Sequence, residues 1–376
     1  MARVLVLGSF AESLVTFRGA LLREFASFGH EVYACAPNAS METKDKLLKL
    51  GVEYCNVYLS RTGMNPLNDI RTFLSFFNLM RRIKPDVFLG YTIKPVLYGS
   101  LAARLAGISG IFSIITGLGY AFSRGDSRQR FAGIIAQFLY KISLSCNQKV
   151  YFQNPDDRNL FKELGFLRGA DQVVLINGSG VDVSFFKKTP FPTGVSFLLI
   201  ARLIKDKGII EYVEAARIIK AKYPGVLFRL VGWFDDNPTS IKKEDLDLWM
   251  EDGIIDYLGR LEDVRPAITA SSVYVLPSYR EGTPRTVLEA MSMGRPVITT
   301  DAPGCRETVI DGENGFLIPI KDVNALVQAM ERFILQPELV VKMGKRSREI
   351  AEVKYDVHKV NTVIMQAMGL LDKNVA

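Results

Sequence analysis

Histidine and cysteine are scarce in this chain of 376 residues, and their scarcity argues against several kinds of site. The two histidines, His30 and His358, offer little to a His-ligated metal centre or a Ser-His-Asp triad. The four cysteines form no Cys-x-x-Cys pair, which argues against a disulfide scaffold or a zinc ribbon. No uncharged apolar run reaches the ~18 residues of a spanning helix, and the start MARVLVLGS lacks the cleavage site of a signal peptide. We therefore expect a cytoplasmic protein, or one attached to a membrane from its cytoplasmic side.

Charge is distributed unevenly along a chain that is long enough for two domains. Single hydrophobic cores stop growing near about 250–300 residues, so this length predicts two domains of similar size. Residues 1–190 carry a net charge of +9 and residues 191–376 a net charge of −2. The asymmetry indicates that the first half faces something anionic, such as nucleic acid, lipid headgroups or a phosphorylated substrate. A basic, solvated surface without a partner would give the same pattern.

Short apolar runs alternate with helix-length segments along the whole chain. Continuous apolar strands that are each followed by a helix are typical of a parallel sheet covered on both faces. The segment KKTPFPTG, residues 187–194, interrupts this alternation with two prolines and a glycine. We predict an α/β protein with two doubly wound, Rossmann-like domains, residues 1–190 and 191–355, and a last helix in 356–376 that packs back on the first domain. Ligands of such sheets bind beyond the carboxyl ends of the strands, so an interdomain cleft is the expected site. In the first half we expect helices that include 17–28 and 96–106, and in the second half helices near 208–222, 241–251, 264–270, 284–293, 304–310 and 322–334.

The most informative stretch is LPSYREGTPRTVLEA, residues 276–290. We expect a helix to begin in its middle, with Thr283 as N-cap and Pro284 at the first position. The free amides of that first turn form an anion site. Glu281 before the helix and Glu289 inside it would bind hydroxyls, since charge-assisted hydrogen bonds are the stronger kind. A ligand with central phosphates and polyols at both ends fits this pattern, as a nucleotide sugar does; a capped helix with two surface acids is the structural alternative.

Two cations, Arg202 and Lys207, lie in a loop between a predicted strand and a helix that begins at Gly208. Cations near a helix terminus can neutralise a diphosphate and stabilise the extra charge of a leaving diphosphate. The Asp-x-Asp pattern, Asp245 and Asp247, lies in a helical run, where residues two apart do not share a face. We therefore expect no metal and no other cofactor.

These features resemble glycosyltransferase family 4, whose members are retaining transferases of the two-domain GT-B fold. The matching residues are Arg202 and Lys207 in AR-x4-KG, Glu281 and Glu289 with seven residues between them, PSYREG, and INGSGVD, residues 176–182. The similarity spans nearly the whole chain. The segments FRGALLREFASFGHEV and TGLGYAF look most like bacterial members that add a hexose or N-acetylhexosamine to an undecaprenyl-diphosphate-linked sugar.

The resemblance implies roles for individual residues. The catalytic residues would be Arg202, Lys207 and Glu281. Arg202 and Lys207 would bind the donor diphosphate, and Glu281 would bind the donor sugar. Glu289 would bind the ribose. Other donor-binding residues would be Gly8, Ser9, Gly259, Leu261, Gly282, Thr283, Pro284 and Arg285, of which Pro284 has no N–H and contributes only shape. The candidates for holding the acceptor and its diphosphate, placed at strand ends or a helix start, are Arg18, Lys94, Thr116, Gly117 and Gly119.

Two departures from the family pattern fall in the first domain. Many relatives carry paired glycines where this chain has Gly8 and Ser9, and many place a histidine in the loop that here reads YTIK, residues 91–94. We therefore assign no general base. In a retaining transferase of this kind the leaving phosphate can take the proton of the acceptor hydroxyl, while the protein supplies positioning and charge stabilisation.

Two segments of the first domain, residues 70–84 and 120–141, mix aromatic and basic side chains. A helix that exposes both kinds of side chain can lie on an anionic bilayer. A helix that packs its apolar side chains in the core and leaves its charges in solvent would have the same sequence pattern. Outside the motifs, His30 is expected to close a helix before a strand. Trp233 either lines the donor pocket or packs in the core.

The sequence thus predicts transfer of a hexose or N-acetylhexosamine, with GalNAc as the expected sugar, from a UDP-sugar to an undecaprenyl-diphosphate-linked saccharide. The expected partners are a nucleotide sugar, a lipid-linked saccharide and the anionic inner face of the cell membrane, without nucleic acid. A GDP-mannose-dependent mannosyltransferase of the same fold and a basic membrane- or nucleic-acid-binding module are the alternatives. A nicotinamide-dependent oxidoreductase would need GxGxxG after the first strand, where this chain has GSFAES.

Overall fold

The computed structural model describes residues 1–60, 65–117, 127–235 and 239–371. The chain divides into two compact units, Met1–Ser179 with His358–Ala376, and Gly180–Val357. In the described residues, unit 1 contains a 7-stranded sheet in the order β3-β2-β1-β4-β5-β6-β7, and unit 2 a 6-stranded sheet in the order β10-β9-β8-β11-β12-β13. All pairs of neighbouring strands are parallel. The predicted α/β class with two doubly wound domains is confirmed.

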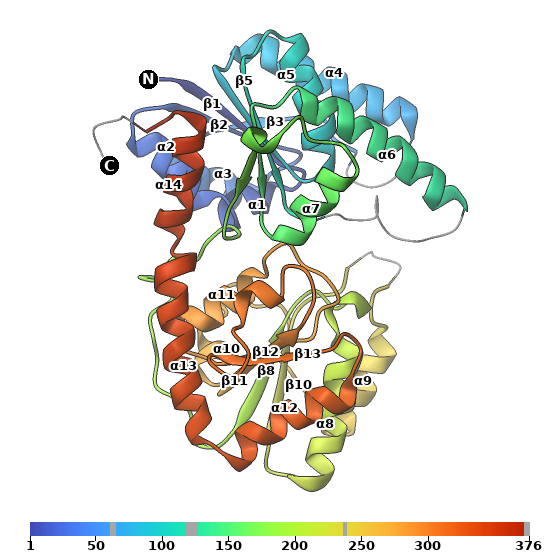
Figure 1. Cartoon of the computed structure of the whole chain (residues 1–376), viewed down its shortest axis with the longest axis vertical. Coiled ribbons are helices and arrows are strands. Elements are labelled where there is room, and N and C mark those ends of the chain that lie inside the picture. Colours follow the sequence, from blue (N-terminus) through green and yellow to red (C-terminus); the bar gives the residue numbers. More distant parts are fainter. Residues whose placement is uncertain (61–64, 118–126, 236–238, 372–376) are drawn as a thin grey trace. The chain divides into compact units, whose positions relative to one another are not determined.

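Unit 1 buries both faces of its sheet under helices. Val4 and Val6 of β1 pack with α1, α2, α3 and α14, while Leu5 and Leu7 point to the other face and pack with α4 and α5, as the period of two in a strand requires. Figure 1 shows α2 and α14 on one side of this sheet and α4, α5 and α6 on the other. The strands are β1 (Arg3–Leu7), β2 (Glu31–Ala36), β3 (Glu53–Asn56), β4 (Val87–Tyr91), β5 (Gly110–Ile115), β6 (Lys149–Phe152) and β7 (Val173–Leu175). The helices are α1 (Ala11–Thr16), α2 (Gly19–Ser27), α3 (Met41–Lys49), α4 (Pro66–Ile83), α5 (Ser100–Leu105), α6 (Ser127–Ser145), α7 (Pro155–Glu163) and α14 (Val357–Met368), with a π-helix, η1 (Pro95–Gly99), and a 3-10 turn, η3 (Ala170–Gln172).

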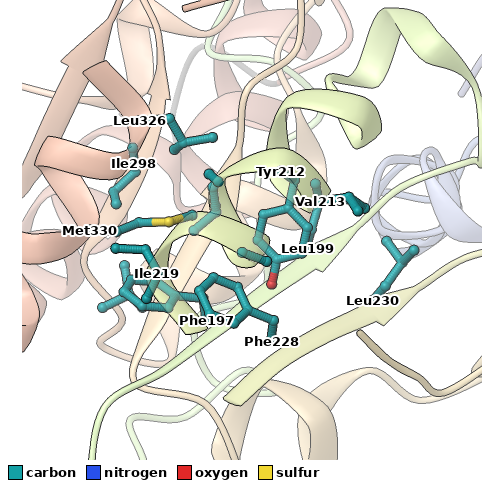
Figure 2. Close-up of a cluster of buried hydrophobic side chains, with 14 of the residues drawn as sticks. Phe197, Leu199, Tyr212, Val213, Ile219, Phe228, Leu230, Ile298, Leu326 and Met330 are labelled. Atoms are coloured by element: carbon teal, nitrogen blue, oxygen red, sulfur yellow. The ribbon is translucent and has the colours of Figure 1, made fainter. Parts of the chain in front are cut away.

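Unit 2 has the same layered plan. Phe197 and Leu199 of β8 pack under α8 and α12 in the cluster drawn in Figure 2, and Leu198 and Ile200 pack on the other face with α10 and α11. The strands are β8 (Ser196–Ile200), β9 (Leu227–Val231), β10 (Asp256–Tyr257), β11 (Val273–Leu276), β12 (Val297–Thr300) and β13 (Gly315–Ile318). The helices are α8 (Ile209–Lys222), α9 (Lys243–Glu251), α10 (Arg265–Thr269), α11 (Arg285–Ser292), α12 (Val323–Leu335) and α13 (Glu338–Ile350), with 3-10 turns η4 (Lys205–Lys207) and η5 (Arg306–Thr308) and a π-helix, η6 (Ala351–Tyr355).

The connector between the domains belongs to unit 2. The guanidinium of Arg295, which is 1% exposed, donates to the carbonyl oxygens of Thr189 and Pro190 at 3.1 and 2.9 Å. These bonds hold the connector against unit 2, so the structure divides the chain before Gly180, where the sequence placed the boundary after residue 190. The chain returns to unit 1 at His358, and α14 adds its apolar side chains to the core of that unit.

Three predicted helical segments differ from the structure in detail. The segment 17–28 contains α2, which runs from Gly19 to Ser27, and a separate short helix, α1, ends just before this segment at Thr16. The segment 304–310 holds only the single turn η5. In the segment 96–106 the first turn is the π-helix η1, which starts at Pro95, a residue that has no N–H for the regular helical ladder.

Candidate functional site

The loops after β8 and β11 meet at the carboxyl edge of the sheet in unit 2. The two strands are parallel neighbours, so their loops leave the sheet side by side. The Nζ of Lys207 in the first loop donates to Oε1 of Glu281 in the second. Their side chains are 16% and 14% exposed. The structure therefore joins a cation and a carboxylate that the sequence places 74 residues apart.

The backbone of the Lys207 loop is fixed to the loop after β11. The N–H of Tyr279 donates to the carbonyl oxygen of Asp206 at 2.9 Å, and the hydroxyl of Ser278 donates to the same oxygen at 3.1 Å. Gly208 has a φ of +71° and approaches so closely that a Cβ there would lie 2.2 Å from the carbonyl oxygen of Pro277. Only glycine accommodates this combination, and it holds Lys207 at the edge of the sheet.

Glu281 is held from its other side by the loop after β12. Its N–H donates to the carbonyl oxygen of Pro303 at 2.9 Å. Gly304, with a φ of +82°, lies where a Cβ would be 2.2 Å from the carbonyl oxygen of Glu281. Just before these loops, near the ends of β12 and β11, the hydroxyl of Thr299 donates to the carbonyl oxygen of Leu276 at 2.7 Å. Three loops thus fix the position of one carboxylate.

Glu289 lies inside α11 and is paired with Arg285 one turn earlier. The Nε of Arg285 donates to Oε1 of Glu289 at 2.8 Å. Burial raises the pKa of Glu289 above its usual value, and the Arg285 charge counteracts part of that rise. The predicted cap was wrong by one residue, because the N-cap is Pro284 and the helix begins at Arg285. Pro284 has an extended ψ of 109°, so the chain turns into the helix one residue later than Thr283 would require.

Arg202 is held by an acid that the sequence did not single out. Its Nη1 donates to Oδ2 of Asp235 at 2.8 Å. Close by in sequence, Trp233 is 42% exposed, and the Arg260 guanidinium lies 5.2 Å from the centre of its ring. Trp233 therefore does not pack in the core. Asp235 lies in the loop after β9, and this position is the one signal that could have identified it.

The remaining donor-site candidates of unit 2 lie in the same set of loops. Gly259 has a φ of +70°, and its carbonyl oxygen accepts from the N–H of Gly232 at 2.9 Å. Leu261 packs against the buried cluster under β8 and β11. Gly282 and Pro284 are buried, and Thr283 is half-buried, in the segment between Glu281 and α11.

Two further residues of unit 2, Tyr279 and Glu211, were missed. The Tyr279 hydroxyl donates to Oε1 of Glu211 in α8 at 2.6 Å. Burial raises the pKa of the Tyr279 phenol, and the bond to Glu211 raises it further. Tyr279 belongs to the PSYREG motif, but its partner lies on another helix, and no sequence spacing connects the two.

At the carboxyl edge of unit 1, the first loop lies against β4. Gly8 is buried next to Tyr91, whose hydroxyl oxygen is 2.3 Å from where a Gly8 Cβ would be. The hydroxyl of Thr92 donates to the hydroxyl of Ser9 at 2.9 Å. Arg18 is 2% exposed, and its guanidinium lies 5.1 Å from the centre of the Tyr91 ring. Gly8 and Arg18 therefore lie against one tyrosine, Tyr91, and Ser9 contacts the threonine that follows it.

The other acceptor candidates are distributed around this edge. The Nζ of Lys94 donates to Oδ1 of Asp69 at 2.7 Å, and both side chains are largely buried. Thr116 and Gly117 directly follow β5 and are half-buried. Gly119 lies outside the described residues.

The opposite edge of unit 1 contains a cavity of about 320 Å³ lined by Arg3, Glu31, Tyr33, Glu53, Cys55, Arg82 and Ile83. These residues include the first residues of β1, β2 and β3, whereas doubly wound sheets bind ligands at the carboxyl ends of their strands. The Nε of Arg3 and the hydroxyl of Tyr33 both donate to the Glu31 carboxylate there. We therefore place the candidate site at the carboxyl edges and not in this cavity.

The described residues contain neither a metal-binding cluster nor a helix suited to cross a membrane. No cluster of three or more His, Cys, Asp or Glu side chains in the described ranges could hold a metal ion. Asp245 and Asp247 are both exposed on α9. None of the described helices combines the length and the apolar character that crossing a bilayer requires.

Comparisons with known proteins identify the class. Residues 182–350 match the model described as glycosyl transferases group 1, and residues 3–154 match the model described as glycosyl transferase 4-like. The fold is similar to that of sucrose-phosphate synthase from Thermosynechococcus elongatus, with a TM-score of 0.81, 17% identity and coverage of 97% of this chain and 98% of that one. It is also similar to HepE of Anabaena in complex with UDP and glucose, with a TM-score of 0.78, 16% identity and coverage of 99% and 100%. The chain belongs to the glycosyltransferases of the GT-B fold.

Two curated relatives carry more specific names. The chain is 25% identical over 387 residues to N,N'-diacetylbacillosaminyl-diphospho-undecaprenol alpha-1,3-N-acetylgalactosaminyltransferase of Campylobacter jejuni, covering 99% of this chain and 100% of the relative. It is 26% identical over 301 residues to UDP-Gal:alpha-D-GlcNAc-diphosphoundecaprenol alpha-1,3-galactosyltransferase of Escherichia coli, covering 75% and 74%.

Proposed function

We propose that this glycosyltransferase moves a hexose or N-acetylhexosamine, with GalNAc as the expected sugar, from a UDP-sugar to an undecaprenyl-diphosphate-linked saccharide in surface polysaccharide or glycan assembly. The observation that carries the proposal is the contact of Lys207 with Glu281 at the carboxyl edge of unit 2, beside the helix that holds Arg285 and Glu289. The two relatives named above act on undecaprenol-linked saccharides according to their names, which supports the acceptor class.

The paired charges of this edge suit a ligand with phosphates between polar rings. Lys207 can exchange its bond with Glu281 for a phosphate oxygen, and Glu281 then accepts hydrogen bonds from sugar hydroxyls. Arg202 can contact the same diphosphate when its guanidinium leaves Asp235. Glu289, held by Arg285, supplies the carboxylate for the ribose. Each ligand group meets a side chain of matching chemistry.

The proposed mechanism retains the anomeric configuration. The bond between the sugar and the diphosphate breaks while the acceptor oxygen approaches on the same face, and a phosphate oxygen of the leaving group takes the acceptor proton. The negative charge that grows on the diphosphate is stabilised by Lys207 and Arg202, so the step uses these side chains and no metal. Glu281 fixes the sugar ring so that its reacting carbon faces the acceptor.

The test begins with the donor. Calorimetry with UDP-GalNAc, UDP-GlcNAc, UDP-Gal and GDP-mannose should show binding of a UDP-sugar. Transfer to a synthetic undecaprenyl-diphosphate-linked saccharide should yield a product that retains the anomeric configuration of the donor, as measured by NMR. Binding of GDP-mannose alone would favour the mannosyltransferase. Retention on a nucleic-acid column without binding of any nucleotide sugar would overturn the enzyme proposal.

Two single variants distinguish the role of Glu281 from that of Glu289. Glu281→Ala should reduce transfer by about 100-fold or more while UDP still binds, because it removes contacts to the sugar. Glu289→Ala should weaken UDP itself, by about tenfold for the loss of a charge-assisted hydrogen bond. Glu244→Ala, an exposed acid of α9, is the matched control and should change neither. If the first two variants behave like the control, the donor site lies elsewhere.

We further propose that the protein binds an anionic membrane surface through α6. Ile134 and Phe138 on this helix are 65% and 63% exposed, and Ile135 and Ile142 continue the same apolar stripe. Lys141 is exposed beside it, and α6 contains no acidic residue. An apolar stripe bordered by positive charge matches the boundary between anionic headgroups and acyl chains. Binding through this stripe would bring the enzyme to the membrane that carries a lipid-linked acceptor.

Vesicle sedimentation tests this surface. The full chain should bind phosphatidylglycerol vesicles and bind phosphatidylcholine vesicles much less. The double variant Ile134→Glu and Phe138→Glu should lose binding by about tenfold or more, while transfer to a water-soluble, short-chain acceptor stays unchanged. Leu248→Glu, at a residue that is 52% exposed on α9, is the control. Equal sedimentation of both proteins would show that α6 is not the membrane-binding face.

A further inference from the structure

Thr92 has a strained backbone at the carboxyl end of β4. Its φ is +69°, in the left-handed region that β-branched residues rarely adopt. The other non-glycine residues with positive φ in the described part of the chain are Asn38, Lys84 and Lys321, none of them β-branched. Such strain persists where the surrounding structure requires a particular conformation, and it is concentrated at functional sites.

The hydroxyl of Thr92 is hydrogen-bonded to the hydroxyl of Ser9, and this bond limits the further hydrogen bonds that Ser9 can make. Thr92 donates to the hydroxyl oxygen of Ser9 at 2.9 Å, so the proton of Ser9 must go to another acceptor. The described residues provide no such acceptor, and Ser9 is half-buried. The pair therefore presents one O–H donor at the edge of the sheet.

The neighbourhood of this donor is constrained and suited to an anion. The π-helix η1 begins three residues after Thr92, and π-turns are frequent at functional sites. Tyr91 fills the space above Gly8, and Arg18 lies against the Tyr91 ring. A buried guanidinium against the Tyr91 ring, at the same edge of the sheet as this O–H donor, favours an anionic oxygen over a neutral one.

We propose that Thr92 is a positioning residue, which holds the Ser9 hydroxyl so that its proton is donated to an oxygen of a substrate diphosphate. The inference rests on the proposed function and adds a residue to it. The diphosphate belongs either to the nucleotide sugar or to the lipid-linked acceptor, and kinetics with each substrate varied in turn distinguish the two.

Steady-state transfer by the full chain tests the proposal. Thr92→Val and Ser9→Ala should each lower kcat/KM about tenfold for the substrate whose diphosphate is bound, since hydrogen bonds to charged groups are the stronger kind. The double variant should lose no more than either single one, because both act through one hydroxyl. Thr92→Ser keeps the hydroxyl and should retain activity. Thr16→Val, which removes an exposed hydroxyl bonded to the Glu12 carbonyl oxygen, is the matched control.

A glycine variant separates positioning from folding. Thr92→Gly accepts a φ of +69° without strain, so its Tm should not fall, yet its kcat/KM should drop as in Thr92→Val. If activity falls only in step with Tm, or if the two single losses multiply in the double variant, Thr92 is structural and the proposal is overturned. If the wild type transfers sugar and all variants match it, the proposal fails and the proposed function stands. A wild type that transfers no sugar from any donor overturns both.

Discussion

At the scale of single residues, the charged side chains of the unit 2 site are held in pairs of opposite sign. Lys207 contacts Glu281, Arg285 contacts Glu289, and Arg202 contacts Asp235. A partly buried charge that loses its partner is costly, so each pair keeps its members ordered until a ligand replaces one of them. A diphosphate offers that replacement to the cations, and sugar hydroxyls offer it to the acids.

The raised pKa of Glu289 predicts how stability changes with pH. Burial raises this pKa above 4.5, so between 4.5 and the folded-state pKa the folded protein binds more protons than the unfolded chain. Stability therefore falls as pH rises through this interval, by up to about 1.4 kcal/mol per pH unit. Glu289→Gln lacks this titration, so its unfolding free energy relative to wild type should rise with pH across the interval and level off above it. Urea unfolding at a series of pH values measures the difference.

A variant of Arg285 gives a second test of the Glu289 pKa. Its charge and hydrogen bond lower the pKa of Glu289, so Arg285→Met should raise the folded-state pKa further and widen the interval over which stability falls. A difference between Glu289→Gln and wild type that does not depend on pH would mean that Glu289 titrates as it does in the unfolded chain.

Single residues also show what the sequence could predict and what it could not. Lys207, Glu281 and Glu289 were found because each lies at a recognisable place in a strand, loop and helix pattern. Asp235 and Glu211 were missed because each pairs with a side chain from a different loop, Arg202 and Tyr279 respectively. Such pairs form only where loops from separate strands lie at the same edge of the sheet.

At the scale of elements, three loops that follow β8, β11 and β12 position one carboxylate, Glu281. Two close approaches make this possible, one by Gly208 to Pro277 and one by Gly304 to Glu281. Both glycines have a positive φ. The site is therefore built by backbone contacts between loops more than by any one helix.

Gly304 tests the loop packing. Gly304→Ala should cost about 2–4 kcal/mol of stability, because a positive φ costs about 1 kcal/mol and overpacking adds about 1–3 kcal/mol. It should also reduce transfer, since the new methyl displaces Glu281. Gly312→Ala is the matched control, with a φ of +77° but no atom within 4 Å of the added Cβ. It should cost about 1 kcal/mol and leave transfer intact. Equal effects of the two variants would show that the contact with Glu281 is unimportant.

Element boundaries were the least predictable part of the fold. The alternation of apolar runs predicted the parallel sheets of both units, because buried parallel strands are continuous in sequence. The helix α13 was not among the predicted helices, and its buried face is narrow, consisting of Val340, Met343, Gly344 and Ser347. The sequence interpretation of His30 also left out a partner, since its Nε2 lies 3.0 Å from the carbonyl oxygen of Leu370, after α14.

At the scale of the whole molecule, the core of unit 1 depends on both ends of the chain. Val360, Ile364 and Met365 of α14 pack with strands and helices from the first half. The Tyr151 hydroxyl donates to the carbonyl oxygen of Ile364 at 3.1 Å. Unit 1 is therefore incomplete until the last helix has been made, whereas unit 2 is one continuous segment.

This arrangement predicts two unfolding transitions that respond to different variants. Ile364→Ala should lower only the transition of unit 1 and Ile219→Ala only that of unit 2, each by about 2–5 kcal/mol, because both side chains are fully buried in separate cores. UDP at 100 times its Kd should raise the unit 2 transition by about 2.7 kcal/mol, since the proposed donor residues lie there. Scanning calorimetry of wild type and the two variants, with and without UDP, measures these shifts. A single transition that both variants lower equally would mean that the two cores unfold as one cooperative body.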